Sequence, residues 1–134
     1  DRPLATLTPK TKPLSETDRL EAIVLLISEF AAEKKAVDIK AYNVTGLTLT
    51  TDALVICTAT SEPHIKAIFN TVKDGMKVSG ARPSYTEGSF QDGWLLIDFG
   101  DALFHVFREQ AREFYDLDGL WADAPSFTLN LKTA

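Results

Sequence analysis

The chain has 134 residues, 45% of them hydrophobic and 25% charged, and its formal net charge is −5. We therefore expect a single globular domain, and since no apolar run approaches the roughly 20 residues of a membrane-spanning helix and no signal-peptide pattern is present, a cytoplasmic location. The acidic balance argues against a broad surface for nucleic-acid phosphates, and one cysteine with two histidines is too small a set for a structural zinc site.

The first half of the chain predicts two helices and two strands. Residues 1–14 contain three prolines and lack apolar periodicity, so we interpret them as a disordered leader before a domain at 15–125. Ser15 can cap a helix whose apolar residues recur every three or four positions. Residues 37–44 alternate as a strand with Asp38, Lys40 and Tyr42 on a solvated side, and the apolar run at 53–58 predicts a strand covered on both faces. Ser61 then caps a helix that ends at Gly80.

The second half predicts three more strands and two short helices, followed by a polar tail at 126–134. A short strand is expected around 84–87, a hairpin at 93–107, a helix at 108–115 and a helical turn at 117–121. This order indicates an α/β fold, a single domain in which helices pack against a mixed β-sheet.

The hairpin carries an unusual turn, because Phe99 stands beside Gly100 where turn-forming residues are the norm. An exposed aromatic side chain there would indicate a contact surface. Residues 85–125 contain nine acidic and two basic residues, a local net charge of −7, and nine of the 13 aromatic residues of the chain. This stretch predicts a negative, aromatic-rich face that suits a basic partner protein.

Several residues allow a catalytic interpretation, and each has a structural alternative. Cys57 lies inside a strand with no helix N-terminus beside it, which favours buried packing over a nucleophile. His64 and His105 lack a convergent set of catalytic groups, so a structural role is favoured for both. Asp98 and Asp101 flank the turn and could share a divalent cation, but acids at a hairpin end more often bond turn amides.

The chain resembles the ribosomal silencing factors, also called the Iojap-like family. The resemblance covers about residues 17–125 and rests on linked segments at 38–39, 51–61, 64–68, 87–88, 93–101, 105–107 and 112–125. It implies an α/β fold similar to nucleotidyltransferases, no enzymatic activity and no cofactor. It also implies repression of translation through the large ribosomal subunit: the factor binds ribosomal protein L-fourteen and blocks joining of the small subunit.

The resemblance further implies that the block from Trp94 to His105 is the partner-binding region. Carried over by position, Trp94 and Phe99 are apolar anchors, Asp98 and Asp101 are acidic or turn-setting groups, and flanking contacts come from His105 and Tyr115. The chain departs from the family at Glu62-Pro63, where many members have a polar residue followed by Arg. Because Trp94 and Phe99 would be costly to expose, we also expect self-association of the free protein through part of this surface.

Two alternatives stay open. In a nucleotidyltransferase-like enzyme that binds a nucleotide or metal, Ser61 would hold phosphate and Asp98 with Asp101 would hold magnesium. In a factor that binds ribosomal RNA directly, affinity would depend on leader lysines and on Lys66, Lys73 and Lys77. The acidic composition leads us to predict no dominant direct RNA binding.

Overall fold

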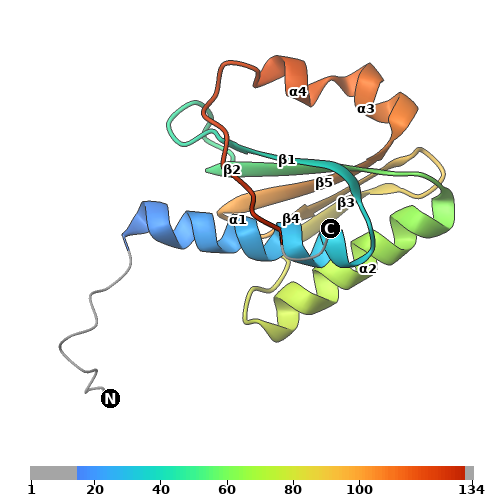
Figure 1. Ribbon diagram of the computed structural model, residues 1–134, viewed down its shortest axis with the longest axis horizontal. Coiled ribbons are helices and arrows are strands. Elements are labelled where there is room, and N and C mark those ends of the chain that lie inside the picture. The colour runs from blue at the N-terminus through green and yellow to red at the C-terminus, as the bar shows by residue number, and fades with distance from the viewer. Residues whose placement is uncertain (1–14, 132–134) are drawn as a thin grey trace.

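The computed structural model describes residues 15–131 and contains the predicted elements in the predicted order (Figure 1). Their bounds are α1 (Glu16–Glu33), β1 (Val37–Asn43), β2 (Ala53–Ala59), α2 (Glu62–Val78), β3 (Tyr85–Ser89), β4 (Trp94–Asp98), β5 (Ala102–Arg108), α3 (Glu109–Tyr115) and α4 (Leu117–Leu120). The leader predicted at 1–14 lies outside the described residues.

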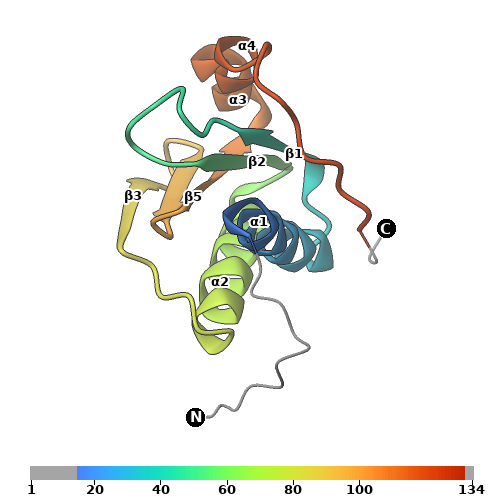
Figure 2. The same ribbon diagram turned by 90° about the vertical axis from the view of Figure 1, so that its left-hand side faces the viewer.

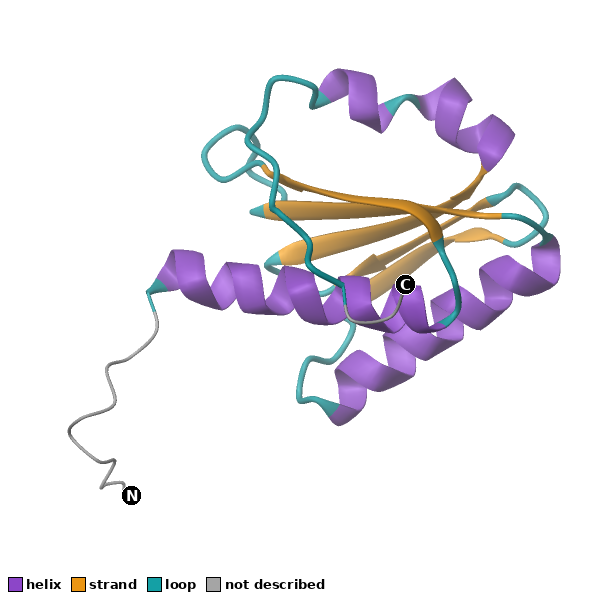
Figure 3. Ribbon diagram, viewed as in Figure 1, coloured by secondary structure: helices purple, strands orange, loops and turns teal. Residues whose placement is uncertain are grey.

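The five strands form one sheet in the order β1-β2-β5-β4-β3. The central pair, β2 and β5, is parallel, and the other neighbours are antiparallel, which confirms the predicted mixed sheet. Figures 2 and 3 show α1 and α2 on one side of the sheet and α3 with α4 on the other. The helices therefore divide the protein into three layers, and the two sides of the sheet have separate environments.

The main core lies between the sheet and the pair α1 and α2. It takes alternate residues of the two central strands, which are fully buried: Val55, Cys57, Phe104 and Val106. Burial raises the pKa of the Cys57 thiol and keeps it protonated, so this side chain packs as a small apolar group, as predicted.

Polar residues fix the ends of the two long helices. Ser15 Oγ accepts the Asp18 N–H at 3.0 Å, and Ser61 Oγ accepts the His64 N–H at 3.1 Å, as expected for N-caps. His64 has a structural role: its Nδ1 accepts the Thr60 N–H at 2.9 Å, and its Nε2 donates to the Lys34 carbonyl oxygen at 2.6 Å. This imidazole therefore ties the end of α1 to the start of α2.

The prediction of a solvated side on β1 is wrong at Tyr42, which is buried. The register shifts between Val37 and Lys40, where Asp38 has φ of 51°, so the simple alternation fails there. Tyr42 packs in a second core cluster on the side of the sheet that α3 and α4 cover. The sequence pattern of β1 alone does not reveal this second layer.

Residues 126–131, predicted as the start of a polar tail, are part of the folded domain. The Phe127 N–H donates to the Ala41 carbonyl oxygen at 2.9 Å, and Tyr42 and Ser126 form an isolated antiparallel bridge. Phe127 and Leu129 pack against the main core. This segment covers the outer edge of β1, whereas β3 forms the opposite edge of the sheet.

Candidate functional site

The register of the β4–β5 hairpin places three of the predicted partner-binding residues, Trp94, Asp98 and His105, on one side of the sheet. Along β4, Trp94, Leu96 and Asp98 stand opposite three residues of β5 that share their side: Phe107, His105 and Leu103. The intervening residues of β4, Leu95 and Ile97, enter the main core under α1 and α2. The first set therefore lies on the side that carries α3.

This side of the sheet is only partly covered. α3 packs against β2 and β5, and the side chains toward β4 are half-buried. We call the uncovered part the open face, defined by Trp94, Leu96, Asp98, Leu103 and the ring of Tyr115 from α3. Apolar side chains dominate the open face, and α3 forms its border.

Five ring side chains join β4, β5 and α3 into an aromatic cluster: Trp94, His105, Phe107, Phe114 and Tyr115. The His105 ring stacks between Trp94, at a centroid distance of 6.2 Å, and Phe107, at 5.7 Å. Tyr115 lies 5.9 Å from both Trp94 and Phe107, and Phe114 meets Tyr115 edge-on at 5.2 Å. Aromatic pairs at these separations attract one another, so the five rings stabilise one another's positions.

Exposure increases outward through the aromatic cluster. Phe107 and His105 are buried, Trp94 is half-buried, Tyr115 is 52% exposed and Phe114 is 81% exposed. Leu120 of α4 adds a further side chain that is 67% exposed. Large side chains that are exposed next to one another, on a buried aromatic base, are typical of a surface that binds a protein.

His105 supports this surface from below. The Trp94 Nε1–H donates to His105 Nδ1 at 3.1 Å, so the imidazole is neutral with its proton on Nε2. Burial lowers the pKa of His105 to about 4, which keeps the ring neutral at physiological pH. The resemblance implied a flanking contact at His105, whereas the residue pattern favoured a structural role. The ring is buried and holds the Trp94 indole. This arrangement follows from the register of β4 with β5.

The turn between β4 and β5 differs from the expectation of an exposed aromatic tip. Phe99 is half-buried and packs against the main core. Asp98 Oδ1 accepts the Gly100 N–H at 2.7 Å, and Gly100 adopts φ of 92°, so Asp98 sets the turn. The Asp101 side chain is exposed, while its carbonyl oxygen accepts the N–H groups of Asp52 and Ala53, both at 3.1 Å. Phe99 is therefore displaced from the open face.

The catalytic alternatives gain no support from these positions. Ser61 Oγ is engaged in the α2 cap, and the Asp98 carboxylate is engaged in the turn. Across residues 15–131, no three His, Cys, Asp or Glu side chains gather in a way that could hold a metal ion. Within the same residues, no helix is long and apolar enough to cross a membrane.

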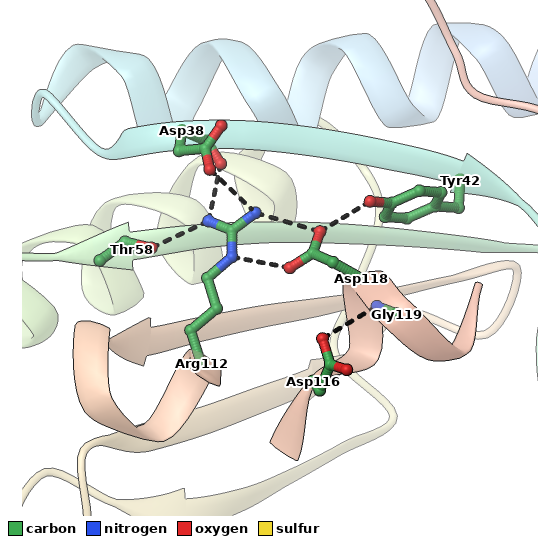
Figure 4. A network of polar contacts seen from close by, with 7 residues as sticks. All are labelled: Asp38, Tyr42, Thr58, Arg112, Asp116, Asp118 and Gly119. Carbon is green, nitrogen blue, oxygen red and sulfur yellow. Dashed lines mark hydrogen bonds and ion pairs between the residues drawn. The ribbon is translucent and has the colours of Figure 1, made fainter. Parts of the chain in front are cut away.

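A network of polar contacts centred on Arg112 fastens α3 and α4 to the sheet (Figure 4). Its Nε–H donates to Asp118 at 2.9 Å, and the Nη1 group donates to the Asp38 carbonyl oxygen and to Thr58 Oγ1, both at 2.8 Å. The Tyr42 hydroxyl donates to the same Asp118 carboxylate at 2.6 Å. One buried guanidinium thus joins β1, β2 and the residues that follow α3.

Charge and burial shape the protonation of this network. Burial alone would raise the pKa of Asp118, but hydrogen bonds from Arg112 and Tyr42 outweigh it and lower that pKa. Burial and the hydrogen bond to Asp118 raise the pKa of Tyr42 to about 12. Arg112 is one of the two basic residues counted in the acidic stretch 85–125. Its burial was not predictable from the sequence because its partners Asp38 and Thr58 lie on β1 and β2, far away along the chain.

The surface around the aromatic cluster keeps its acidic character because Arg112 is buried. Arg108 is the other basic residue of the stretch and is exposed. Most of the acidic residues of the stretch are exposed: Glu87, Asp92, Asp101, Glu109, Glu113, Asp116 and Asp123. The folded protein therefore presents an aromatic surface with an excess of negative charge around it.

Comparison with known proteins gives consistent matches. A family model described as "Ribosomal silencing factor during starvation" matches residues 17–134. The chain is 33% identical over 105 residues to ribosomal silencing factor RsfS of Bacillus subtilis, which covers 78% of this chain and 89% of that protein. For RsfS of Halalkalibacterium halodurans the identity is 38% over 97 residues, with 72% and 83% covered. A solved protein structure from Chromobacterium violaceum has a TM-score of 0.74 at 27% identity, covering 86% of this chain and 95% of that chain.

Proposed function

Since the chain belongs to the ribosomal silencing factor family, we propose that it represses translation by binding the large ribosomal subunit and blocking its association with the small subunit. In this proposal the direct partner is ribosomal protein L-fourteen. The observation that carries it is the aromatic cluster, whose exposed members, Phe114 and Tyr115, stand on a buried base within an acidic surface.

The chemistry of this surface fits a basic protein. Large aromatic side chains are the residues that most often anchor protein interfaces, and exposed carboxylates attract a positively charged partner and orient it. A ribosomal protein, which binds RNA, supplies such positive charge. The open face beside the aromatic cluster offers Leu96 and Leu103 as further apolar contacts.

Steric exclusion is a sufficient mechanism. A folded domain fixed to the joining surface of the large subunit occupies the place of an inter-subunit contact, and this requires no reactive group. The relatives are named as silencing factors and not as enzymes, which is consistent with a regulator that has no catalytic step.

Co-sedimentation with purified subunits tests the proposal directly. We expect the protein to sediment with large subunits, not with small subunits, and to reduce formation of complete ribosomes when both are mixed. The Tyr115→Ala variant should bind much more weakly. Leu49→Ala, which removes a fully exposed apolar side chain that belongs neither to the aromatic cluster nor to the open face, should bind like wild type. Equal binding by wild type and Tyr115→Ala would reject the aromatic cluster as the contact.

The nucleotidyltransferase alternative has its own test. Calorimetric titration of the protein with nucleoside triphosphates and magnesium would release binding heat at micromolar concentration if this alternative held. We expect no such heat, because Ser61 and Asp98 are engaged in the helix cap and the turn.

A further inference from the structure

Helix α2 lies in the layer opposite α3 and α4 (Figure 2). Its sequence contains three lysines. Lys66, Lys73 and Lys77 are spaced by seven and four residues, so they follow one side of the helix over a length of about 16 Å. Arg82 follows in the connection to β3. We call these four residues the lysine strip.

Two of the ammonium groups are held over aromatic rings. Lys66 Nζ lies 4.9 Å from the centre of the Phe90 ring, and Lys73 Nζ lies 5.7 Å from the centre of the Phe69 ring. The two rings meet edge-on at 6.2 Å. Cation–π contacts of this kind restrict the lysine side chains while leaving their charge available to an anion.

The strip keeps its positive charge within the described part of the chain. The ion pairs found there belong to Arg112, and none involves the lysine strip. The acidic residues of α2 near the strip, Glu62 and Asp74, are exposed and leave an excess of basic residues. A chain with a net charge of −5 therefore separates its charges, with carboxylates around the aromatic cluster and ammonium groups along α2.

We propose that the lysine strip binds the phosphate backbone of ribosomal RNA when the aromatic cluster is seated on its protein partner. This inference rests on the proposed function. A linear series of ammonium groups matches a polyanion better than it matches a single small anion. The Phe69 and Phe90 rings hold two of these ammonium groups in line along the helix. The strip orients the bound domain, and the aromatic cluster selects the partner.

A salt series with matched variants tests the strip. The triple variant Lys66→Gln, Lys73→Gln, Lys77→Gln removes three charges at surface positions of α2. The control variant Lys34→Gln, Lys35→Gln, Lys40→Gln removes the same charge at exposed positions outside the strip. Binding to large subunits is measured by co-sedimentation from low to high salt. We expect the slope of log affinity against log salt to be shallower by about two for the first variant. The reason is that each phosphate contact that the variant loses reduces the slope by roughly 0.7 to 0.9. The control slope should match wild type.

Hydroxyl-radical footprinting of the subunit RNA identifies the occupant. Wild type and control should protect a segment of RNA that the strip variant leaves unprotected. Equal salt slopes for all three proteins, with binding still weakened in Tyr115→Ala, would overturn the RNA-binding role of the lysine strip and leave the proposed function intact. A shallower slope with unchanged RNA protection would assign the strip to an acidic protein and overturn its RNA role. If the wild type fails to bind the large subunit, the proposed function itself fails.

Discussion

The indole N–H of Trp94 donates to Nδ1 of His105 over 3.1 Å, and the two rings lie nearly parallel with an angle of 19° between their planes. A buried neutral imidazole therefore fixes the orientation of the Trp94 indole. Because Tyr115 from α3 rests against that same indole, the hairpin and the helix present one continuous surface.

Loss of the exposed Tyr115 ring should remove a large part of the free energy of binding to the large subunit. We expect Tyr115→Ala to weaken binding to the large subunit by about 2 kcal/mol, roughly 30-fold in Kd, as for interface hot spots. Trp94→Ala should weaken binding at least as much, with some loss of stability because Trp94 also packs in the second core cluster. Sedimentation titration measures both, with Leu49→Ala as the control. Variants within twofold of wild type would contradict the assignment.

Phe99 is expected to behave differently from Tyr115. Since its side chain packs against the main core, Phe99→Ala should lower the free energy of unfolding by about 2 kcal/mol, below the range of a fully buried Phe. Urea unfolding followed by fluorescence measures this. If Phe99→Ala has native stability but binds the large subunit poorly, Phe99 contacts the partner and its assignment to the core is wrong.

Acid should destabilise the protein through His105. The folded-state pKa is about 4, below the ordinary value of about 6.5, so the unfolded state binds the extra proton first. The His105 contribution to stability is complete above about pH 6.5 and falls by about 3 kcal/mol as the pH approaches 4. A proton on Nδ1 would also face the Trp94 N–H and remove their hydrogen bond.

The variant His105→Asn isolates this effect, because its side-chain oxygen still accepts a hydrogen bond but does not titrate. Urea unfolding between pH 7 and pH 4 should show a smaller loss of stability in His105→Asn than in wild type. Parallel curves for the two proteins would mean that carboxyl groups alone account for the acid sensitivity.

The polar network around Arg112 should contribute strongly to the stability of the layer formed by α3 and α4. Arg112→Ala leaves the partly buried Asp118 carboxylate without its cation, and we expect a loss of about 3 kcal/mol in unfolding free energy. Arg112→Lys should restore little, because an ammonium group cannot reproduce the forked contacts to Asp118 and Thr58. The exposed Arg108 gives the control substitution Arg108→Ala, which should change stability by less than about 0.5 kcal/mol.

Much of the fold follows from local patterns. Periodicity, the Ser15 and Ser61 caps and the apolar run of β2 each depend on neighbours close in sequence, and these predictions are confirmed. Tyr42 and residues 126–131 were misjudged, and the burial of Arg112 was not predicted, because their environment comes from distant segments. Tyr42 and Asp118 are 76 positions apart, and Arg112 and Thr58 are 54 apart.

In the candidate site, too, some features follow from the sequence and others depend on contacts between distant segments. Composition indicated an acidic, aromatic-rich region, and resemblance indicated Trp94, His105 and Tyr115. The side on which each residue lies depended on the pairing of β4 with β5, which a single sequence does not specify. Phe114 was absent from the predicted set, although two adjacent aromatic residues at the end of a short helix were a usable indication of an exposed patch.

Self-association should compete with ribosome binding. The free protein exposes Phe114, Tyr115 and Leu120 to water, and a second copy could cover them through the same surface. We expect sedimentation equilibrium at tens of micromolar to show dimers that Tyr115→Ala weakens. Purely monomeric wild type at that concentration would contradict this prediction.

Negative charge around the aromatic cluster should speed association with the basic partner. Glu113 and Asp101 are exposed acids in this stretch, and long-range attraction between exposed charges is screened within about 10 Å at 0.1 M ionic strength. Glu113→Lys and Asp101→Lys should each slow association by about threefold at low salt and flatten its salt dependence, with smaller effects on dissociation. Stopped-flow mixing with purified L-fourteen measures these rates, and Glu33→Lys at the end of α1 is the control.

Because the isolated ribosomal protein carries no RNA, the lysine strip should not contribute in this experiment. If the strip variant slows association as much as Glu113→Lys does, the acidic surface is not the main source of attraction.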